Sequence, residues 1–348
     1  MEGENIVSEE IHGCLLRPLR WLLAAAACWL CLETLGISQD ESAATPQGSP
    51  QQVEFGMVLK ASGGGFKNVV GTVTVPGDWP NQQRVRVVKD DLPPGAVVNY
   101  RNIKDVGRQM AIQIPSVPAG RQVRAVVTFE VQRLAPTAAL PDVKQFRAPD
   151  PHAKERKLAV YLAPSPKIES DDPQVGKAAE EAVGDRQGAW EMVEAIHQWV
   201  HKNIEFAGDL ENVNTCMQTL QLRRGVCAEM NSLTVAMLRA GGFPARLVRI
   251  PGHCYYEVYL LDGQGQGHWL AGDASRDATI TPGTAAEGVI LQKGDNVSLI
   301  DPTTKRRTKG RFLAETCVGV AQSSASRMRF QPISPALAAA RQKPVAEK

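Results

Sequence analysis

The chain has 348 residues, of which 43% are hydrophobic, 22% are charged and 5% are aromatic. This length is sufficient for two domains, and this balance is typical of a protein with an apolar core. The net charge of +2 and the low aromatic content argue against nucleic-acid binding, because they offer neither a basic field nor stacking platforms. We therefore expect no nucleic acid among the partners.

The first 38 residues have the order of a secretory signal. Two arginines precede an apolar run at 21–32, and small residues follow it. The run is much shorter than the roughly 20 residues of a membrane-spanning helix. We predict a signal peptide at 1–38, cleaved after Ser38, and a periplasmic, cell-surface or secreted protein. Lipidation at Cys28 is an alternative, so a membrane is expected as a partner only through an N-terminal anchor or lipid.

Cysteine usage does not indicate a disulfide framework. The part of the chain after the signal contains four cysteines, namely Cys216, Cys227, Cys254 and Cys317. Four cysteines in about 300 residues are too few for such a framework. One pair, such as Cys216 with Cys317, is compatible with an exported protein, and the sequence leaves the pairing open.

Short β-strands are predicted in the first half of the chain. After a polar linker at 39–52, apolar and polar residues alternate in short runs that end at Pro or Gly, up to residue 134. This pattern predicts an antiparallel β-sandwich domain at 53–163. The glycine-rich run at 63–66 lacks the Lys-Ser/Thr and the helix of a phosphate-binding loop, so we interpret it as a turn.

The second half changes to a helical period. Residues 174–206 carry apolar side chains on one helical face, and a second helix is predicted at 227–240, closed by two glycines. Three strand-like segments follow, at 245–250, 253–260 and 267–272. Helices followed by an antiparallel sheet indicate an α+β domain, which we place at 164–330. The last residues, 331–348, are predicted to form a disordered tail.

Cys227 stands at the start of the second helix. Free backbone amides and the positive end of the helix dipole lie at that terminus. A thiol there can have a pKa of about 3.5–7.5 instead of about 8.5, and the resulting thiolate can attack an acyl carbon. The backbone amide of Cys227 could face the developing oxyanion. Taken alone, however, a cysteine on an apolar helix is usually a core residue.

A base and an orienting carboxylate follow in the chain. His253 begins a strand directly after a Pro-Gly turn, and Asp273 ends the next strand. Antiparallel pairing of these strands would bring Asp273 back beside His253. Cys227, His253 and Asp273 then form a nucleophile, a base and an orienting group in chain order.

Four motifs around these residues resemble the transglutaminase-like superfamily, a cysteine-dependent acyl-transfer family related to papain-like proteases. They are Gly225–Cys227, Arg239–Arg246, His253–Val258 and Trp269–Ser275. The resemblance covers residues 190–290, and residues 53–163 are similar to the β-sandwich that precedes the core in bacterial members. It implies a papain-like α+β core with the nucleophile at a helix N-terminus packed on an antiparallel sheet. It also implies that Cys227 is the nucleophile, His253 the general base and Asp273 its orienting residue, with no cofactor.

The sequence departs from the family pattern close to the triad. Cys254 and Tyr255 stand where the family has Ala and Trp, and Ala274 and Ser275 replace Pro-Thr. None of these changes removes a triad atom. The second thiol raises the prospect of redox inactivation, or of a disulfide that blocks Cys227.

Further site residues follow from the same resemblance. Gln218 and Gln221 are candidates for the remaining oxyanion donor. Arg246 stands where the family has a fixed Arg, and we expect Glu257 either to brace the core through Arg246 or to line the substrate groove. Tyr255 belongs to the same structural or groove set.

Metal binding is not expected. His197 and His201 have the i, i+4 spacing of zinc ligands, but Gln198 occupies the place of the metalloprotease Glu, and no third ligand is evident. We interpret the two histidines as residues that flank the apolar stripe of a helix. The alternating Asp and Asn residues of a calcium loop are absent from the sequence.

The sequence therefore predicts an exported thiol acyltransferase that acts on an amide bond of a protein or peptide. Hydrolysis of a peptide or isopeptide bond is the expected reaction. Three alternatives stay open: transamidation between Gln and Lys, deglycosylation at an Asn-linked sugar, and a non-catalytic binding or scaffold protein that retains the fold.

Overall fold

The computed structural model describes residues 45–46, 49–135, 141–150, 156–208, 214–281, 288–300 and 306–335. All of them belong to one compact unit, 42–348. The predicted signal peptide at 1–38 lies outside the described residues, as do residues 336–348 of the predicted tail. Within the described part of the chain, no helix is both long and apolar enough to cross a membrane.

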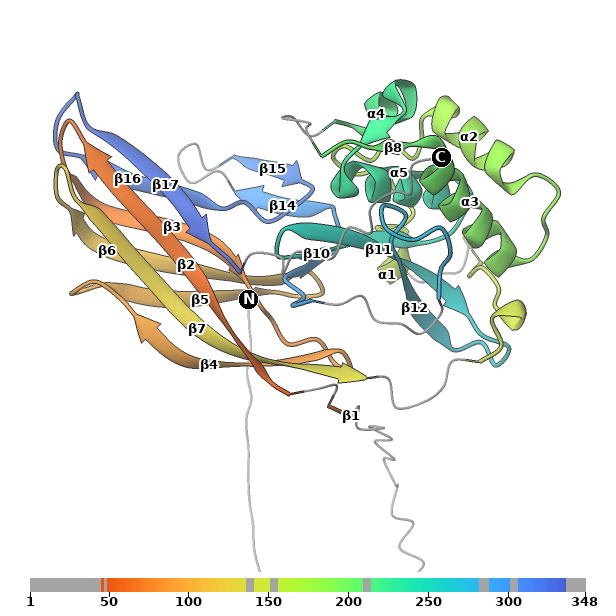
Figure 1. Cartoon of the computed structure of the whole chain (residues 1–348), viewed down its shortest axis with the longest axis horizontal. Coiled ribbons are helices and arrows are strands. Elements are labelled where there is room, and N and C mark those ends of the chain that lie inside the picture. The colour runs from red at the N-terminus through yellow and green to blue at the C-terminus, as the bar shows by residue number, and fades with distance from the viewer. Residues whose placement is uncertain are drawn as a thin grey trace, which may run out of the picture. The chain divides into compact units, whose positions relative to one another are not determined.

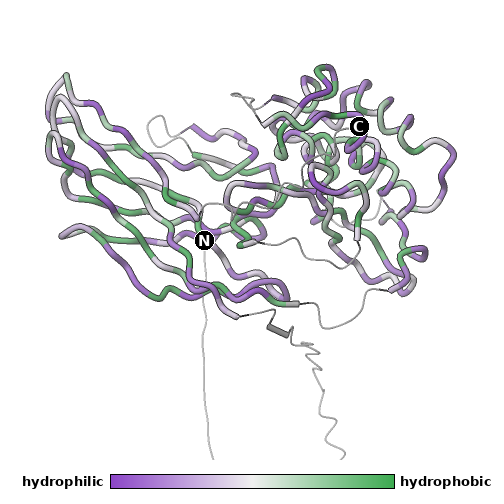
Figure 2. The backbone as a smooth tube through the Cα atoms, in the orientation of Figure 1, coloured by the Kyte–Doolittle hydropathy of each residue, from purple (hydrophilic) through white to green (hydrophobic). Residues whose placement is uncertain are grey.

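The first half is built from β-strands, as predicted. They are β1 (Thr45–Pro46), β2 (Gln51–Ser62), β3 (Phe66–Val75), β4 (Gln83–Asp91), β5 (Val97–Ile103), β6 (Gly107–Val117) and β7 (Gln122–Ala135). Buried and exposed side chains alternate along most of β2, where Phe55, Met57 and Leu59 point into the core. Figure 2 shows the corresponding alternation of hydrophobic and hydrophilic stretches along these strands.

These strands form two antiparallel sheets together with two strands from the C-terminal part, β16 (Thr316–Ala321) and β17 (Arg327–Ile333) (Figure 1). The five-stranded sheet has the order β1-β7-β2-β17, with β4 on β7. In the other sheet, β3 pairs with β6 and β16, and β5 pairs with β6. Side chains from both sheets share one hydrophobic core.

The second half contains the helices. They are the 3-10 helix η1 (Val143–Gln145) and the α-helices α1 (Arg156–Ala159), α2 (Pro173–Val183), α3 (Ala189–Asn203), α4 (Cys216–Leu222) and α5 (Cys227–Ala240). Helix α5 begins and ends at the predicted residues, and it is buried from Glu229 to Arg239. Helices α2, α3 and α4 pack against it.

The remaining strands are β8 (Glu205–Phe206), β9 (Arg224–Gly225), β10 (Ala245–Ile250), β11 (His253–Leu261), β12 (Gly267–Gly272), β13 (Gln292–Lys293), β14 (Val297–Ile300) and β15 (Arg307–Gly310). The predicted antiparallel set β10, β11 and β12 is confirmed. Helix α5 packs on the face of this set that carries Tyr256, Val258 and Leu260. The α+β class with a helix packed on an antiparallel sheet is therefore confirmed.

One short strand joins the two halves. β13 pairs with β10 on one side and with β6 on the other, so that the order β12-β11-β10-β13-β6-β3-β16 is one continuous sheet. β16 and β17 thus pair with N-terminal strands, although the sequence assigned nearly all of their residues to the domain at 164–330. The predicted linker and tail also each overlap a strand, since β2 begins at Gln51 and β17 ends at Ile333. Local composition marks a strand but does not identify its partner, which explains these differences.

Candidate active site

Cys227 is the first residue of α5. The preceding chain approaches the helix closely, because a Cβ atom on Gly225 would lie 3.0 Å from the Cβ of Glu229 and 3.2 Å from Cγ2 of Thr219. The buried Glu229 caps the helix start by accepting a hydrogen bond from the Val226 amide at 2.7 Å. The close approach at Gly225 and this cap fix the half-buried Cys227 at the N-terminus of α5.

His253 is positioned by a tight turn. Ile250 pairs with His253 across the β10–β11 ladder, so only Pro251 and Gly252 form the turn. Gly252 has a φ of 68°, which a glycine adopts without strain. The imidazole therefore stands at the first position of β11, at the end of the sheet.

Asp273 directly follows the last residue of β12 and lies beside this turn. Gly272, the last residue of β12, pairs with Tyr256 of β11, so Asp273 comes back toward the start of β11. Nε2 of His253 lies 2.5 Å from Oδ2 of Asp273, and only 7% and 12% of the two side chains are exposed. This bond leaves Nδ1 of the imidazole for the cysteine.

The thiol of Cys227 has a low pKa. The pKa of Cys227 is lowered to about 4, first by a hydrogen bond from the thiol of Cys254 and then by the hydrogen bond and charge of His253, which together outweigh its burial. Burial alone would lower the pKa of His253, but its bonds to Asp273 and Cys227 raise it to about 9. The contact with His253 thus favours the thiolate of Cys227, and the contacts with Cys227 and Asp273 favour the imidazolium of His253.

The carboxylate of Asp273 is held on both oxygens. Oδ1 accepts hydrogen bonds from Asn231 at 2.9 Å and from the Ser275 hydroxyl at 2.6 Å, while Oδ2 faces His253. Burial would raise the pKa of Asp273, but the bonds from His253, Ser275 and Asn231 lower it. Ser275 thus supplies a hydroxyl at the position where the sequence departs from Thr.

Asn231 is a residue of the site that the sequence pattern did not indicate. It is fully buried in α5, and its Nδ2 lies 3.1 Å from the carbonyl oxygen of Cys227, 3.0 Å from that of Cys254 and 2.9 Å from Oδ1 of Asp273. Its Oδ1 accepts from the Ala274 amide at 3.0 Å. One amide therefore connects the three segments that carry the triad. Its position four residues after Cys227, on the same helix face, was the signal available in the sequence.

The two α3 histidines hold the segment that follows Asp273. The ring of the buried His197 lies 2.7 Å from the Asp277 carbonyl oxygen and 2.8 Å from the hydroxyl of Tyr256. Nδ1 of His201 lies 2.9 Å from the carbonyl oxygen of Ala274. Both rings are therefore engaged in hydrogen bonds of the protein.

Two of the predicted oxyanion donors lie on α4. Gln218 forms a capping box with Thr215. The side-chain Oε1 of Gln218 accepts a hydrogen bond from the backbone N–H of Thr215 at 2.9 Å, and the backbone N–H of Gln218 donates to the Thr215 hydroxyl. This contact gives Gln218 a structural role. Gln221 lies exposed on the same helix and stays a prediction.

Arg246 and Glu257 form a buried ion pair with a partner that the sequence did not suggest. Nη2 of Arg246 lies 2.7 Å from one carboxylate oxygen of Glu257, and Nζ of Lys293 lies 2.5 Å from the other. Burial would raise the pKa of Glu257, but the two cations lower it to about 2. Tyr255 is buried with Val248 in a small cluster on the same face of the sheet.

The thiols and the titratable groups give two further findings. Cys216, Cys227, Cys254 and Cys317 are all free, so the possible pair between Cys216 and Cys317 is not formed. Among the described residues, no group of His, Cys, Asp or Glu side chains has the arrangement of a metal site.

Comparisons with known proteins concern the family and the fold. Residues 176–274 match the model of the transglutaminase-like superfamily, and this segment contains Cys227, His253 and Asp273. Curated proteins gave no significant match. A solved structure of a proposed cysteine protease from Cytophaga hutchinsonii is 17% identical, with a TM-score of 0.53 over 82% of this chain and 91% of that chain. A second structure, of a proposed protease from Parabacteroides distasonis, is 13% identical, with a TM-score of 0.25 over 60% of this chain and 47% of that chain.

The first structure shares the fold of this chain, and the family match locates the core within that fold. Residues 176–274 are therefore similar to the core of the transglutaminase-like superfamily.

Proposed function

We propose that this protein catalyses cysteine-dependent acyl transfer and passes the acyl group to water, so that it hydrolyses peptide or isopeptide bonds. The observation that carries the proposal is the environment of Cys227. Its sulfur has a pKa of about 4 and contacts His253, whose far nitrogen bonds Asp273. A nucleophile, a base and an orienting carboxylate are the three groups that acyl transfer by a thiol requires.

Acylation would begin with attack of the Cys227 thiolate on the carbonyl carbon of the substrate amide. The C–S bond forms as the π electrons of the carbonyl move to oxygen. His253 then donates its proton to the amide nitrogen while the C–N bond breaks, and the amine leaves. A thioester on Cys227 and a neutral His253 result.

Deacylation would use the same groups in the reverse sense. Water attacks the thioester carbon and gives a proton to His253, and the C–S bond breaks to release the acid. The thiolate–imidazolium pair is thereby restored. Asp273 remains ionised throughout and keeps the imidazole in the orientation that faces the sulfur.

The start of α5 would stabilise the oxyanion. The amides of the first helical turn have no acceptor within the helix, and Cys227 is the first residue of that turn. Its backbone N–H supplies one donor for the developing negative charge, and the helix dipole adds to it.

The test is turnover of fluorogenic peptides, isopeptide-linked peptides and an N-glycopeptide, with products identified by mass spectrometry. We expect wild type and Cys317→Ala to release the free acid and Cys227→Ala to release none. Activity that survives in Cys227→Ala would overturn the proposal. An added primary amine tests the acceptor, because a predominantly amine-linked product would establish transamidation instead of hydrolysis.

A non-catalytic scaffold is tested by labelling with a thiol-reactive peptide electrophile. Cys227 should react much faster than Cys317, whose pKa burial raises to about 11. Equal labelling of the two cysteines, together with no turnover, would favour a binding protein.

A further inference from the structure

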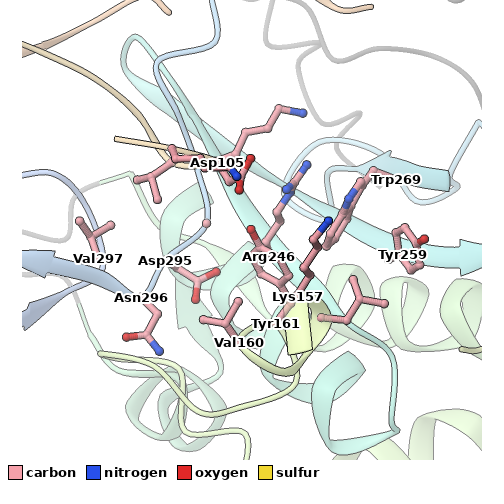
Figure 3. A pocket seen from close by; sticks show the side chains of 15 residues that line it. Asp105, Lys157, Val160, Tyr161, Arg246, Tyr259, Trp269, Asp295, Asn296 and Val297 are labelled. Atoms are coloured by element: carbon pink, nitrogen blue, oxygen red, sulfur yellow. The ribbon is translucent and has the colours of Figure 1, made fainter. Parts of the chain in front are cut away.

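Figure 3 shows a pocket of about 560 Å³. Its residue Tyr259 alternates along β11 with Val258 and Leu260, which pack with α5, so the pocket lies on the opposite face of the sheet. Its lining comes from α1, the turn between β5 and β6, the strands β10, β11 and β12, and the segment 293–297. The pocket is distinct from the triad, because its β11 residue, Tyr259, stands six positions along the strand from His253. This is about 20 Å at a rise of about 3.3 Å per residue. The volume is within the range of small-ligand sites, about 300–1,000 Å³.

Aromatic rings form one wall of this pocket. The ring of Trp269 lies 5.1 Å from that of Tyr161 and 5.2 Å from that of Tyr259, measured between centroids. The guanidinium of Arg246 lies 3.8 Å from the centroid of Trp269. All three rings are only partly buried, so they offer apolar surface to a ligand.

The same pocket carries excess positive charge. Among the described lining residues are four cations, Lys104, Lys157, Arg246 and Lys293, and two carboxylates, Asp105 and Asp295. The charge of Asp295 is balanced by the buried Arg239, which donates hydrogen bonds to both of its carboxylate oxygens, at 2.8 Å and 3.0 Å. Figure 3 shows Lys157, Arg246 and Trp269 gathered in one part of the pocket.

The buried cations share one counter-ion. Arg246 and Lys293 both pair with Glu257, each with a different oxygen, so a single negative charge serves two positive charges. Arg246 also hydrogen-bonds Tyr161. An ammonium has three N–H donors and a guanidinium has five, so these bonds do not use all the donors of either group. Burial lowers the pKa of Lys293 to about 8. The negative charge of Glu257 acts in the opposite direction and raises this pKa, while the positive charge of Arg246 lowers it further. A second anion at this place would relieve the repulsion between the two cations.

We propose that this pocket binds the carboxylate end of a ligand whose aromatic or apolar body lies against Trp269 and Tyr161. The carboxylate takes N–H donors from Arg246 and Lys157, and planar contact with the indole gives the ligand its orientation. A peptide C-terminus and a small free acid both present this chemistry. The proposal concerns binding only, and it does not depend on the reaction at Cys227.

Calorimetric titration tests the proposal with three probes: a tripeptide that ends in phenylalanine with a free carboxylate, the same tripeptide as its C-terminal amide, and N-acetylphenylalanine. The full-length Cys227→Ala protein is used beside wild type so that turnover does not consume the probes. We expect the free-acid peptide to bind at least about tenfold more tightly than the amide, a difference of about 1.4 kcal/mol. Binding of N-acetylphenylalanine as tight as that of the peptide would identify a small acid as the ligand, and weaker binding would identify a peptide end.

Two exposed lysines provide matched variants. Lys157→Glu reverses a charge at the pocket and is expected to weaken binding of the free acid at least about tenfold. Lys177→Glu makes the same change on α2, outside the lining residues, and is expected to leave binding unchanged. Equal affinity for acid and amide, equal affinity in the two variants, or no binding at millimolar concentration would each overturn the proposal.

Discussion

Nδ2 of Asn231 lies 2.9 Å from Oδ1 of Asp273, and the same amide also contacts the carbonyl oxygens of Cys227 and Cys254. A residue one helical turn inside α5 therefore connects the backbones of Cys227 and of Cys254, the neighbour of His253, with the side-chain carboxylate of Asp273. The two N–H donors of Asn231 serve three acceptors, so one bond is shared. This arrangement holds the carboxylate of Asp273 in the orientation in which it bonds the imidazole of His253.

Asn231→Ala should impair the triad without removing any of its members. A hydrogen bond to a charged group contributes about 1.5–3 kcal/mol, which corresponds to a fall in rate of about ten- to a hundredfold. We also expect a lower pKa of His253, because Asp273 loses a fixed orientation. Enzyme kinetics and NMR titration of His253 measure the two effects. A stable Asn231→Ala protein with wild-type rate and His253 titration would contradict the positioning role.

Cys254→Ala should make the nucleophile less acidic. The Cys254 thiol is the largest cause that lowers the pKa of Cys227, and loss of one such bond, about 1.5–3 kcal/mol, raises that pKa by about 1 to 2. Cys254→Ser, which keeps a donor, should change the alkylation profile less. Identical profiles for wild type and Cys254→Ala would show that the thiol does not reach Cys227.

The pH dependence of kcat/KM should follow the thiolate–imidazolium pair. The thiolate is lost as the pH falls through about 4, and the imidazolium is lost as the pH rises through about 9. A bell-shaped profile with flanks near these two values is expected, both belonging to the pair. A single flank near pH 8.5, as for an ordinary thiol, would show that the pair does not form.

Glu257→Gln should destabilise the fold, because Arg246 and Lys293 would stay buried without a counter-ion. Removal of one partner of a buried pair costs about 3–5 kcal/mol, to be measured by urea unfolding. Glu130→Gln, which breaks the exposed pair with Arg86, should have little effect. The charges of Lys293 and Arg246 lower the pKa of Glu257 to about 2, from about 4.5 for a glutamate in water. Its contribution is therefore complete above pH 4.5 and should disappear in wild type as the pH falls through about 2.

We further propose that the protein is exported and cleaved after Ser38. Expression in a secreting host, followed by mass spectrometry of the exported chain, should give an N-terminus at Gln39. An exported chain that still carries residues 1–38 would contradict the cleavage.

The local part of this architecture could be predicted from the sequence. The two glycines at 241–242 mark the end of α5, and the Pro-Gly pair at 251–252 marks the end of β10. Alternation along β11 separates the side chains that face α5 from those that face away. The order Cys227, His253, Asp273 followed from one helix start, one strand start and one strand end. Each of these inferences uses neighbours in the chain.

The rest depends on contacts between distant residues. β13 has only two residues, and nothing in its sequence indicates that it joins β10 to β6. Lys293, in the same short strand, resembles a surface lysine until the pairing places it against Glu257. Asn231 looks like an ordinary polar residue of a helix, and only the packing of α5 on β11 shows that it is buried.

The most direct measurement of the central claim is the rate of iodoacetamide alkylation of Cys227 as a function of pH, in wild type and in His253→Ala. Wild type should react well below pH 8, with a midpoint near the pKa of about 4. His253→Ala should lose much of this reactivity at low pH, because the imidazolium no longer stabilises the thiolate. A thiol that titrates near 8.5 in both proteins would contradict the claim that Cys227 is an activated nucleophile.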